Sequence, residues 1–120
     1  MKAEISKTFR FDAAHRLLAL PAGHKCAGPH GHSYHVTIIV AGEVDPDVGW
    51  VMDFGRIKQV VQPLIDQVDH ADLNEIEGLG NPTSEHIAKW FWDRVKTDLP
   101  GLSAVTVAES DTSTCTYRGQ

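Results

Sequence analysis

The sequence has no apolar run near the ~20 residues that a membrane-spanning helix needs, and no concentrated block of lysine or arginine. Its net charge is −5, so neither a nucleic acid nor an anionic membrane is an expected partner. The first ten residues lack the apolar stretch of a signal peptide, and only two cysteines are present. We therefore expect a cytoplasmic protein with reduced thiols that folds as one domain over residues 1–120.

Histidine is what the sequence has in excess. Five of the seven histidines lie between positions 15 and 35, so the enrichment is local. His30 and His32 stand two residues apart in a segment rich in Val, Ile and Thr, and side chains at that spacing on a strand point to the same side. Two imidazoles on one face, joined by a third from a neighbouring strand, form the ligand set of a catalytic zinc with one open position.

His15 is the third ligand that the order of residues favours, because it ends the first strand and can lie beside the start of the second. His24 and His70 are rivals, whereas His35 points to the opposite face. Cys26, four residues before the pair, is either a further ligand or an acid or base beside the metal. A cupin site is excluded, since positions 36 and 37 hold valine and threonine where a glutamate would be needed.

Alternating apolar and polar residues predict strands at both ends of the chain. Residues 3–11 alternate, with Lys7 the exception on the apolar side, and residues 30–41 form a second strand. Two short strands are expected around 103–109 and 114–118, separated by a polar turn.

Two helices are expected between these pairs of strands. Apolar residues at helical spacing predict a helix that begins at a cap, Asp53, and runs to about position 68. Residues 69–82 are expected to form a loop, and Thr83 or Ser84 then caps a second helix that stops before Pro100. The order β-β-α-α-β-β predicts an α+β fold, with two helices on one face of a four-stranded antiparallel sheet.

Two more carboxylates and one histidine are candidates for chemistry. Glu109 shares a face with Val105 and Val107, so its carboxylate either simply reaches water at the strand end or accepts two hydrogen bonds from paired N–H donors of a ligand. The loop pair Asp69-His70 is either structural or a carboxylate-oriented imidazole that moves protons near neutral pH, if it lies beside Cys26.

Taken together, these motifs give the chain a specific resemblance to a known family. The motifs are FDAAH at 11–15, C-x3-HGH at 26–32, GWVMDF at 49–54, VDH at 68–70 with LN at 73–74, NPTSE at 81–85, and Glu109. This pattern resembles the 6-pyruvoyl-tetrahydropterin synthase superfamily over nearly the whole chain. Three residues separate Cys26 from His30, as in the 6-carboxy-5,6,7,8-tetrahydropterin synthases, whereas the 6-pyruvoyl enzymes usually have five.

The resemblance implies an activity and an assembly. The expected reaction converts 7,8-dihydroneopterin triphosphate to 6-carboxytetrahydropterin, acetaldehyde and triphosphate, as a lyase step in the synthesis of the modified tRNA base queuosine. The expected fold is the tunnelling fold, in which trimers close a barrel and two trimers stack into a homohexamer. Such closure also removes the open edges of a lone four-stranded sheet. Active sites would then lie between subunits.

The resemblance also assigns roles to the candidate residues. His15, His30 and His32 would bind Zn²⁺, which would acidify the substrate's side-chain hydroxyls. The remaining roles follow the family motifs. Cys26 would exchange protons on one side of the substrate, and His70 paired with Asp69 would do so on the other. Glu109 would bind the 2-amino and ring N–H edge of the pterin, with Thr83 and Ser84 as nearby polar contacts.

Other functions remain open from the residues alone. A 6-pyruvoyl-tetrahydropterin synthase would use the same motifs and differ in its product. A non-catalytic module, in which zinc only stabilises a metal- or pterin-binding fold, is a second alternative, and a zinc hydrolase with Glu109 as base is a third. The nearest basic candidates for the triphosphate are Arg16, His24 and Lys25.

Overall fold

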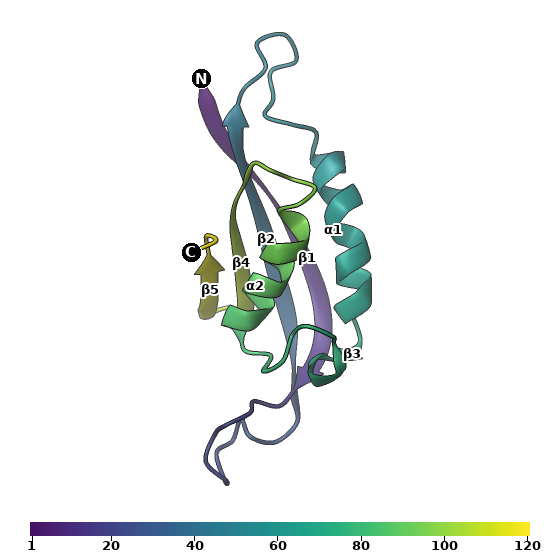
Figure 1. Cartoon of the computed structure of the whole chain (residues 1–120), viewed down its shortest axis with the longest axis vertical. Helices are drawn as coiled ribbons and strands as arrows, with labels where there is room; N and C mark the ends of the chain where they lie inside the picture. The colour runs from purple at the N-terminus through teal and green to yellow at the C-terminus, as the bar shows by residue number, and fades with distance from the viewer.

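Two long antiparallel strands, β1 (Lys2–His15) and β2 (His30–Glu43), form the centre of the fold (Figure 1). The computed structural model describes residues 1–120. The remaining elements are α1 (Phe54–Val68), β3 (Ala71–Asp72), a 3-10 helix η1 (Leu73–Glu75), α2 (Ser84–Val95), β4 (Leu102–Ser110) and β5 (Ser113–Tyr117). Both helices lie on one face of the sheet, as Figure 1 shows.

The predicted α+β class is confirmed, but the sheet has one strand more than expected. Its order is β3-β1-β2-β4-β5, and the four long strands pair antiparallel as the sequence predicts. The additional strand, β3, pairs parallel with β1 through Ala71 and Asp72, inside the segment expected to be a loop. Two residues are too few to give a strand pattern in a sequence, so this pairing depends on where β1 lies in space.

The core lies between the sheet and the two helices, and the strand alternation produces it. Tyr34, Val36 and Ile38 on β2 are fully buried, whereas His35 between them is exposed on the other face. The helices contribute the apolar residues expected from their spacing, including Ile57 and Phe91. The same face of β2 that carries the core therefore carries His30 and His32 at its beginning.

Side-chain caps set the beginnings of both helices. Asp53 accepts a hydrogen bond from the Gly55 N–H at 2.8 Å and caps α1. Thr83 accepts from the His86 N–H at 3.2 Å and caps α2, which decides between the two residues considered for that cap. The bounds 53–68 and the stop before Pro100 agree with the observed helices.

One face and two edges of the sheet have no covering element within the chain. The helices cover one face only, and the edge strands are β3 and β5. Unpaired edge strands present free N–H and C=O groups and are normally covered or paired. No helix in the structure combines the length and apolar character needed to cross a membrane.

Candidate active site

Three imidazoles meet where β1 ends and β2 begins. The register places His15 opposite His30 and Ala13 opposite His32, so the sheet brings residues distant in sequence to one point. The Nε2 atoms of His15 and His30 are 2.9 Å apart, and one ring nitrogen from each of the three histidines lies within 4.8 Å of the others. Cys26 does not belong to this convergent group. Of the ligand sets considered from the sequence, the three-histidine set is therefore the one that the structure assembles.

Hydrogen bonds at the far side of the rings determine which nitrogens carry protons. His15 Nδ1 lies 2.7 Å from the Pro82 carbonyl oxygen, and His30 Nδ1 lies 2.9 Å from the Gly28 carbonyl oxygen. Because a carbonyl only accepts, both Nδ1 atoms carry the hydrogen, and both Nε2 atoms of the neutral rings present lone pairs. Two lone pairs facing each other at 2.9 Å repel unless a cation or a proton lies between them.

The remaining features of the cluster also fit a metal ion. His32 Nε2 is buried and has no hydrogen-bond partner in the chain, a costly state for a polar atom. Burial lowers the pKa of His15, which is 1% exposed, and so favours the neutral form that metals bind. The carbonyl partners orient the rings in the way that residues around metal sites usually do. The cluster is suited to a divalent cation that accepts three nitrogen ligands, as zinc does.

A cavity of about 400 Å³ opens beside the histidines. It is lined by Leu17, Lys25, Cys26, His30, His32 and Glu109. Cys26 is half-buried there, in a turn whose ends are joined by the Ala27 N–H and the His24 carbonyl. Its backbone is held on both sides, because the Leu17 N–H donates to the Cys26 carbonyl and the Cys26 N–H donates to His24 Nδ1. The thiol is thus in the same cavity as two of the proposed ligands.

Glu109 connects this cavity to a second hollow. It lies where the register of β4 against β5 shifts, between Ala108 and Ser110, at a β-bulge. One carboxylate oxygen is 3.8 Å from Nε2 of both His15 and His32. The second hollow, about 340 Å³, is lined by Ser84, Glu85, Glu109, Ser113, Thr114 and Cys115. Thr83, in contrast, uses its hydroxyl to cap α2 and does not line either hollow.

Asp69 and His70 lie together but not beside Cys26. Their side chains are 3.1 Å apart, and His70 is 80% exposed at the edge of the sheet. His70 has a left-handed backbone (φ 58°), held by its N–H, which donates to the Asp12 carbonyl at 2.6 Å. The Asp12 N–H in turn donates to Asp69 Oδ1 at 3.0 Å. Cross-strand bonds from β1 therefore orient the pair.

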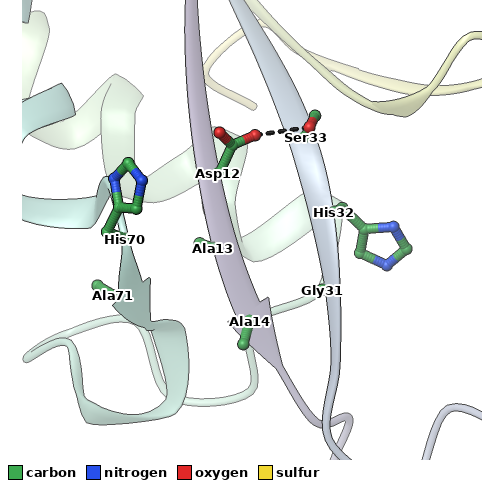
Figure 2. A pocket seen from close by; sticks show the side chains of 8 residues that line it. All are labelled: Asp12, Ala13, Ala14, Gly31, His32, Ser33, His70 and Ala71. Atoms are coloured by element: carbon green, nitrogen blue, oxygen red, sulfur yellow. Dashed lines mark hydrogen bonds between the residues drawn. The ribbon is translucent and has the colours of Figure 1, made fainter.

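His70 lines a groove of about 530 Å³ on the sheet, which shares His32 with the histidine cavity but does not include Cys26. Figure 2 shows Asp12 on β1, between His70 on one side and Ser33 on β2 on the other, with the His32 ring pointing away from His70. A hydrogen bond from the Ser33 hydroxyl holds the pKa of Asp12 below its usual value, so this groove carries a firmly ionised carboxylate. Within one chain the structure does not bring His70 and Cys26 into one cavity.

Sequence reasoning missed several residues that build the site. The side-chain oxygens of Asn74 and Asn81 accept from the backbone N–H groups of Arg16 and Leu18, and so hold the loop after β1 in place. The Tyr34 hydroxyl lies 3.1 Å from His15 Nδ1. Asparagines beside turn residues, in segments without periodicity, were the only signal available, and such a signal does not show which backbone they bind.

Comparisons with known proteins agree with this architecture. Residues 4–120 match the family model described as 6-pyruvoyl tetrahydropterin synthase, and the chain belongs to that family. A curated relative from Synechocystis sp., named 6-carboxy-5,6,7,8-tetrahydropterin synthase, is 39% identical over 94% of this chain and 91% of its own length. A Pyrococcus furiosus relative, named dihydroneopterin monophosphate aldolase, is 39% identical over 84% of this chain and 82% of its own.

A solved structure of the family shares the fold closely. The structure of Caenorhabditis elegans 6-pyruvoyl tetrahydropterin synthase aligns with a TM-score of 0.92 at 29% identity, covering 100% of this chain and 97% of that one. The resemblance stated from the sequence is therefore confirmed, and the relatives are all named as enzymes. Their names differ in substrate and product, so family membership leaves the reaction itself to be proposed.

Proposed function

We propose that the protein is a zinc-dependent carbon–carbon lyase that converts 7,8-dihydroneopterin triphosphate to 6-carboxy-5,6,7,8-tetrahydropterin, acetaldehyde and triphosphate, as a step towards queuosine. The observation that supports it most directly is one cavity containing two of the three converging imidazoles, a thiol and a carboxylate. The Synechocystis relative supports the choice of product, as does the three-residue spacing between Cys26 and His30.

The proposed reaction needs no oxidant or reductant from outside. The triphosphate leaves with its bridging oxygen, one water is consumed to supply the second oxygen of the carboxyl group, and the other atoms of the substrate divide between the carboxypterin and acetaldehyde. The first side-chain carbon is oxidised to the carboxyl level, while the dihydropterin ring gains two hydrogens and the two outer carbons leave at the lower combined oxidation level of acetaldehyde. Oxidation and reduction therefore balance within the substrate. A site made only of a Lewis acid and proton-transfer groups is therefore chemically sufficient.

Glu109 would orient the pterin. An ionised carboxylate accepts two parallel N–H bonds, and the 2-amino group and ring N–H of a pterin offer such a pair. Because Glu109 lies between the two hollows, a pterin bound to it would occupy the hollow lined by Ser84 and Cys115 and extend its side chain past the histidines. Ser84 would be a polar contact there. The Thr83 hydroxyl already accepts the hydrogen bond from the His86 N–H that caps α2, so it would contact substrate only while keeping that bond.

Cys26 would exchange protons with the carbons of the substrate side chain. Zinc, when bound by His15, His30 and His32, supplies a positive charge that makes the side-chain hydroxyls more acidic. The turn around Cys26 is held by backbone hydrogen bonds, and Cys26 lines the histidine cavity. The thiol would take a proton from one side-chain carbon and return it to the next.

His70, oriented by Asp69, would act from a neighbouring subunit. In one chain His70 lines a groove that does not include Cys26, and the edges of the sheet are open. Pairing of β3 and β5 edges between copies would close the sheets into a ring and bring the groove of one copy towards the cavity of the next. We therefore propose a homohexamer built as a dimer of trimers, with sites between subunits.

Two other reactions have specific support. The Caenorhabditis elegans neighbour favours a 6-pyruvoyl product, which would release triphosphate but no acetaldehyde. The Pyrococcus furiosus relative favours an aldolase-type cleavage of a monophosphate, which would release a phosphorylated two-carbon aldehyde. The three reactions differ in the fate of the side-chain carbons, so the products distinguish them.

Product analysis tests the proposal. Zinc-loaded protein is incubated with 7,8-dihydroneopterin triphosphate, and the pterin and aldehyde products are identified by mass spectrometry. We expect 6-carboxytetrahydropterin and acetaldehyde in equal amounts. A 6-pyruvoyl product without acetaldehyde, or a phosphorylated aldehyde, would replace the proposed reaction with one of the alternatives, and binding without any turnover would favour the non-catalytic module.

A further inference from the structure

We propose that Lys25 binds the phosphate chain of the substrate and so selects for phosphorylated pterins. This inference rests on the proposed function and adds the residue that recognises the anionic end. Among the six residues that line the cavity beside the histidines, Lys25 is the one with a permanent positive charge. Arg16 and His24, the other basic candidates from the sequence, do not line that cavity.

The turn that presents Cys26 also presents Lys25. The two residues occupy the central positions of the turn closed by the His24 carbonyl and the Ala27 N–H. The same turn is held against the loop by the bond from the Leu17 N–H to the Cys26 carbonyl. A backbone fixed in this way directs the lysine stem to the cavity while the ammonium keeps the mobility needed to follow a flexible phosphate chain.

Lys25 is also free to bind an anion. The structure contains no ion pair or side-chain hydrogen bond to Lys25, whereas Lys89 is bound to Asp93 at 2.6 Å and Lys96 donates to two carbonyl oxygens. An unpaired ammonium beside a cavity does not have to break an existing contact before it binds phosphate. The cost of recognition is therefore limited to ordering the lysine side chain.

The negative and positive side chains lie in different parts of the two hollows, and this would orient a bound ligand. Glu109 belongs to both hollows, whereas Lys25 belongs only to the one with Cys26 and the histidines. A ligand held at its N–H edge by Glu109 must extend past the histidines to reach Lys25. This order, N–H edge, then hydroxyl-bearing carbons, then phosphates, is the order of groups along dihydroneopterin phosphate.

Steady-state kinetics with charge variants tests this role. The zinc-loaded wild-type protein, without a histidine tag, is compared with Lys25→Ala and Lys25→Arg. The control is Lys58→Ala, on the exposed face of α1. We expect Lys25→Ala to raise KM, or the dissociation constant if turnover is absent, about tenfold or more for dihydroneopterin triphosphate, since a hydrogen bond to a charged group is worth that much. Lys25→Arg should restore most of the binding, and Lys58→Ala should change nothing.

Binding of 7,8-dihydroneopterin, which lacks phosphate, separates the possible outcomes. Under the proposal its dissociation constant changes less than about twofold in Lys25→Ala, because no phosphate contact is lost. An equal loss of affinity for both ligands, or a fall in kcat with KM unchanged, would overturn the phosphate role and assign Lys25 to the thiol or the loop. If the wild-type protein forms none of the expected products, the proposed function fails, while the ratio of the two dissociation constants still tests Lys25.

Discussion

Zinc binding should stabilise the fold strongly, and the effect can be worked from the three imidazoles. In the metal-free protein the lone pairs of His15 and His30 face each other at 2.9 Å, and His32 Nε2 is buried without a partner. A metal that binds only the folded chain adds about 4 kcal/mol to the free energy of unfolding when its free concentration is a thousand times its dissociation constant. An unfolding entropy of about 2.1 cal/mol/K per residue over 120 residues converts this into a rise in Tm of roughly 16 °C.

The perturbation that tests this reasoning is His32→Ala. Loss of a direct ligand should weaken binding at least as much as loss of a group behind a ligand, which costs about 10–100-fold. At 100-fold weaker binding and the same free zinc, the stabilisation falls to about 1.4 kcal/mol and the rise in Tm to roughly 6 °C. His35→Ala is the matched control, because His35 is on the same strand but is exposed on the opposite face.

The assay is differential scanning calorimetry of metal-free protein titrated with buffered zinc, with the wild type and the two variants side by side. We expect large rises in Tm for the wild type and His35→Ala, and a small rise for His32→Ala. An equal rise in all three proteins would show that zinc binds elsewhere, for example at the cluster of Asp12, Asp69 and His70. No rise in the wild type would refute the metal site itself.

Three further substitutions separate catalysis, substrate binding and stability. Cys26→Ala should reduce kcat at least about 100-fold by removing a proton-transfer group, whereas Lys58→Ala, on the exposed face of α1, should keep it; equal activity of both would remove Cys26 from the mechanism. Glu109→Gln should raise the dissociation constant for dihydroneopterin about 10-fold or more in fluorescence titrations, and unchanged affinity would mean that the pterin binds elsewhere. Asp53→Ala removes the cap on α1 and should cost about 1 kcal/mol, or roughly 4 °C in Tm by thermal denaturation, with activity at 25 °C unaffected; an unchanged Tm would show that the cap contributes nothing.

The site could be predicted from the sequence where periodicity controls direction. Period two along β2 places His30 and His32 on the face that also carries Tyr34 and Val36, and the structure has them there. Glu109 was expected on the face of Val105 and Val107, and it lies beside the histidines. The β-bulge at that point left no pattern in the sequence.

The position of the Asp69-His70 pair could not be predicted from the sequence. Neighbouring residues in a loop can face either side of a sheet, and only the bonds from Asp12 on β1 decide which. The pair lies away from Cys26 in a single chain, so its proposed role depends on a second copy. The position of Lys25 could not be predicted either. The sequence has three basic residues near Cys26, and only in the folded loop does one of them, Lys25, line the cavity.

The sequence by itself determined the α+β class, the Asp53 cap of α1 and the common face of His30 and His32, because each depends on local spacing and local hydrogen bonds. Only the tertiary structure decided that one ring nitrogen of each histidine meets the others, that the Pro82 and Gly28 carbonyls fix the protons of His15 and His30, and that Glu109 joins two hollows. The physical reason is that these contacts connect residues far apart in the chain. Their distances are set by the register of the sheet and the packing of the loop, which no local pattern encodes.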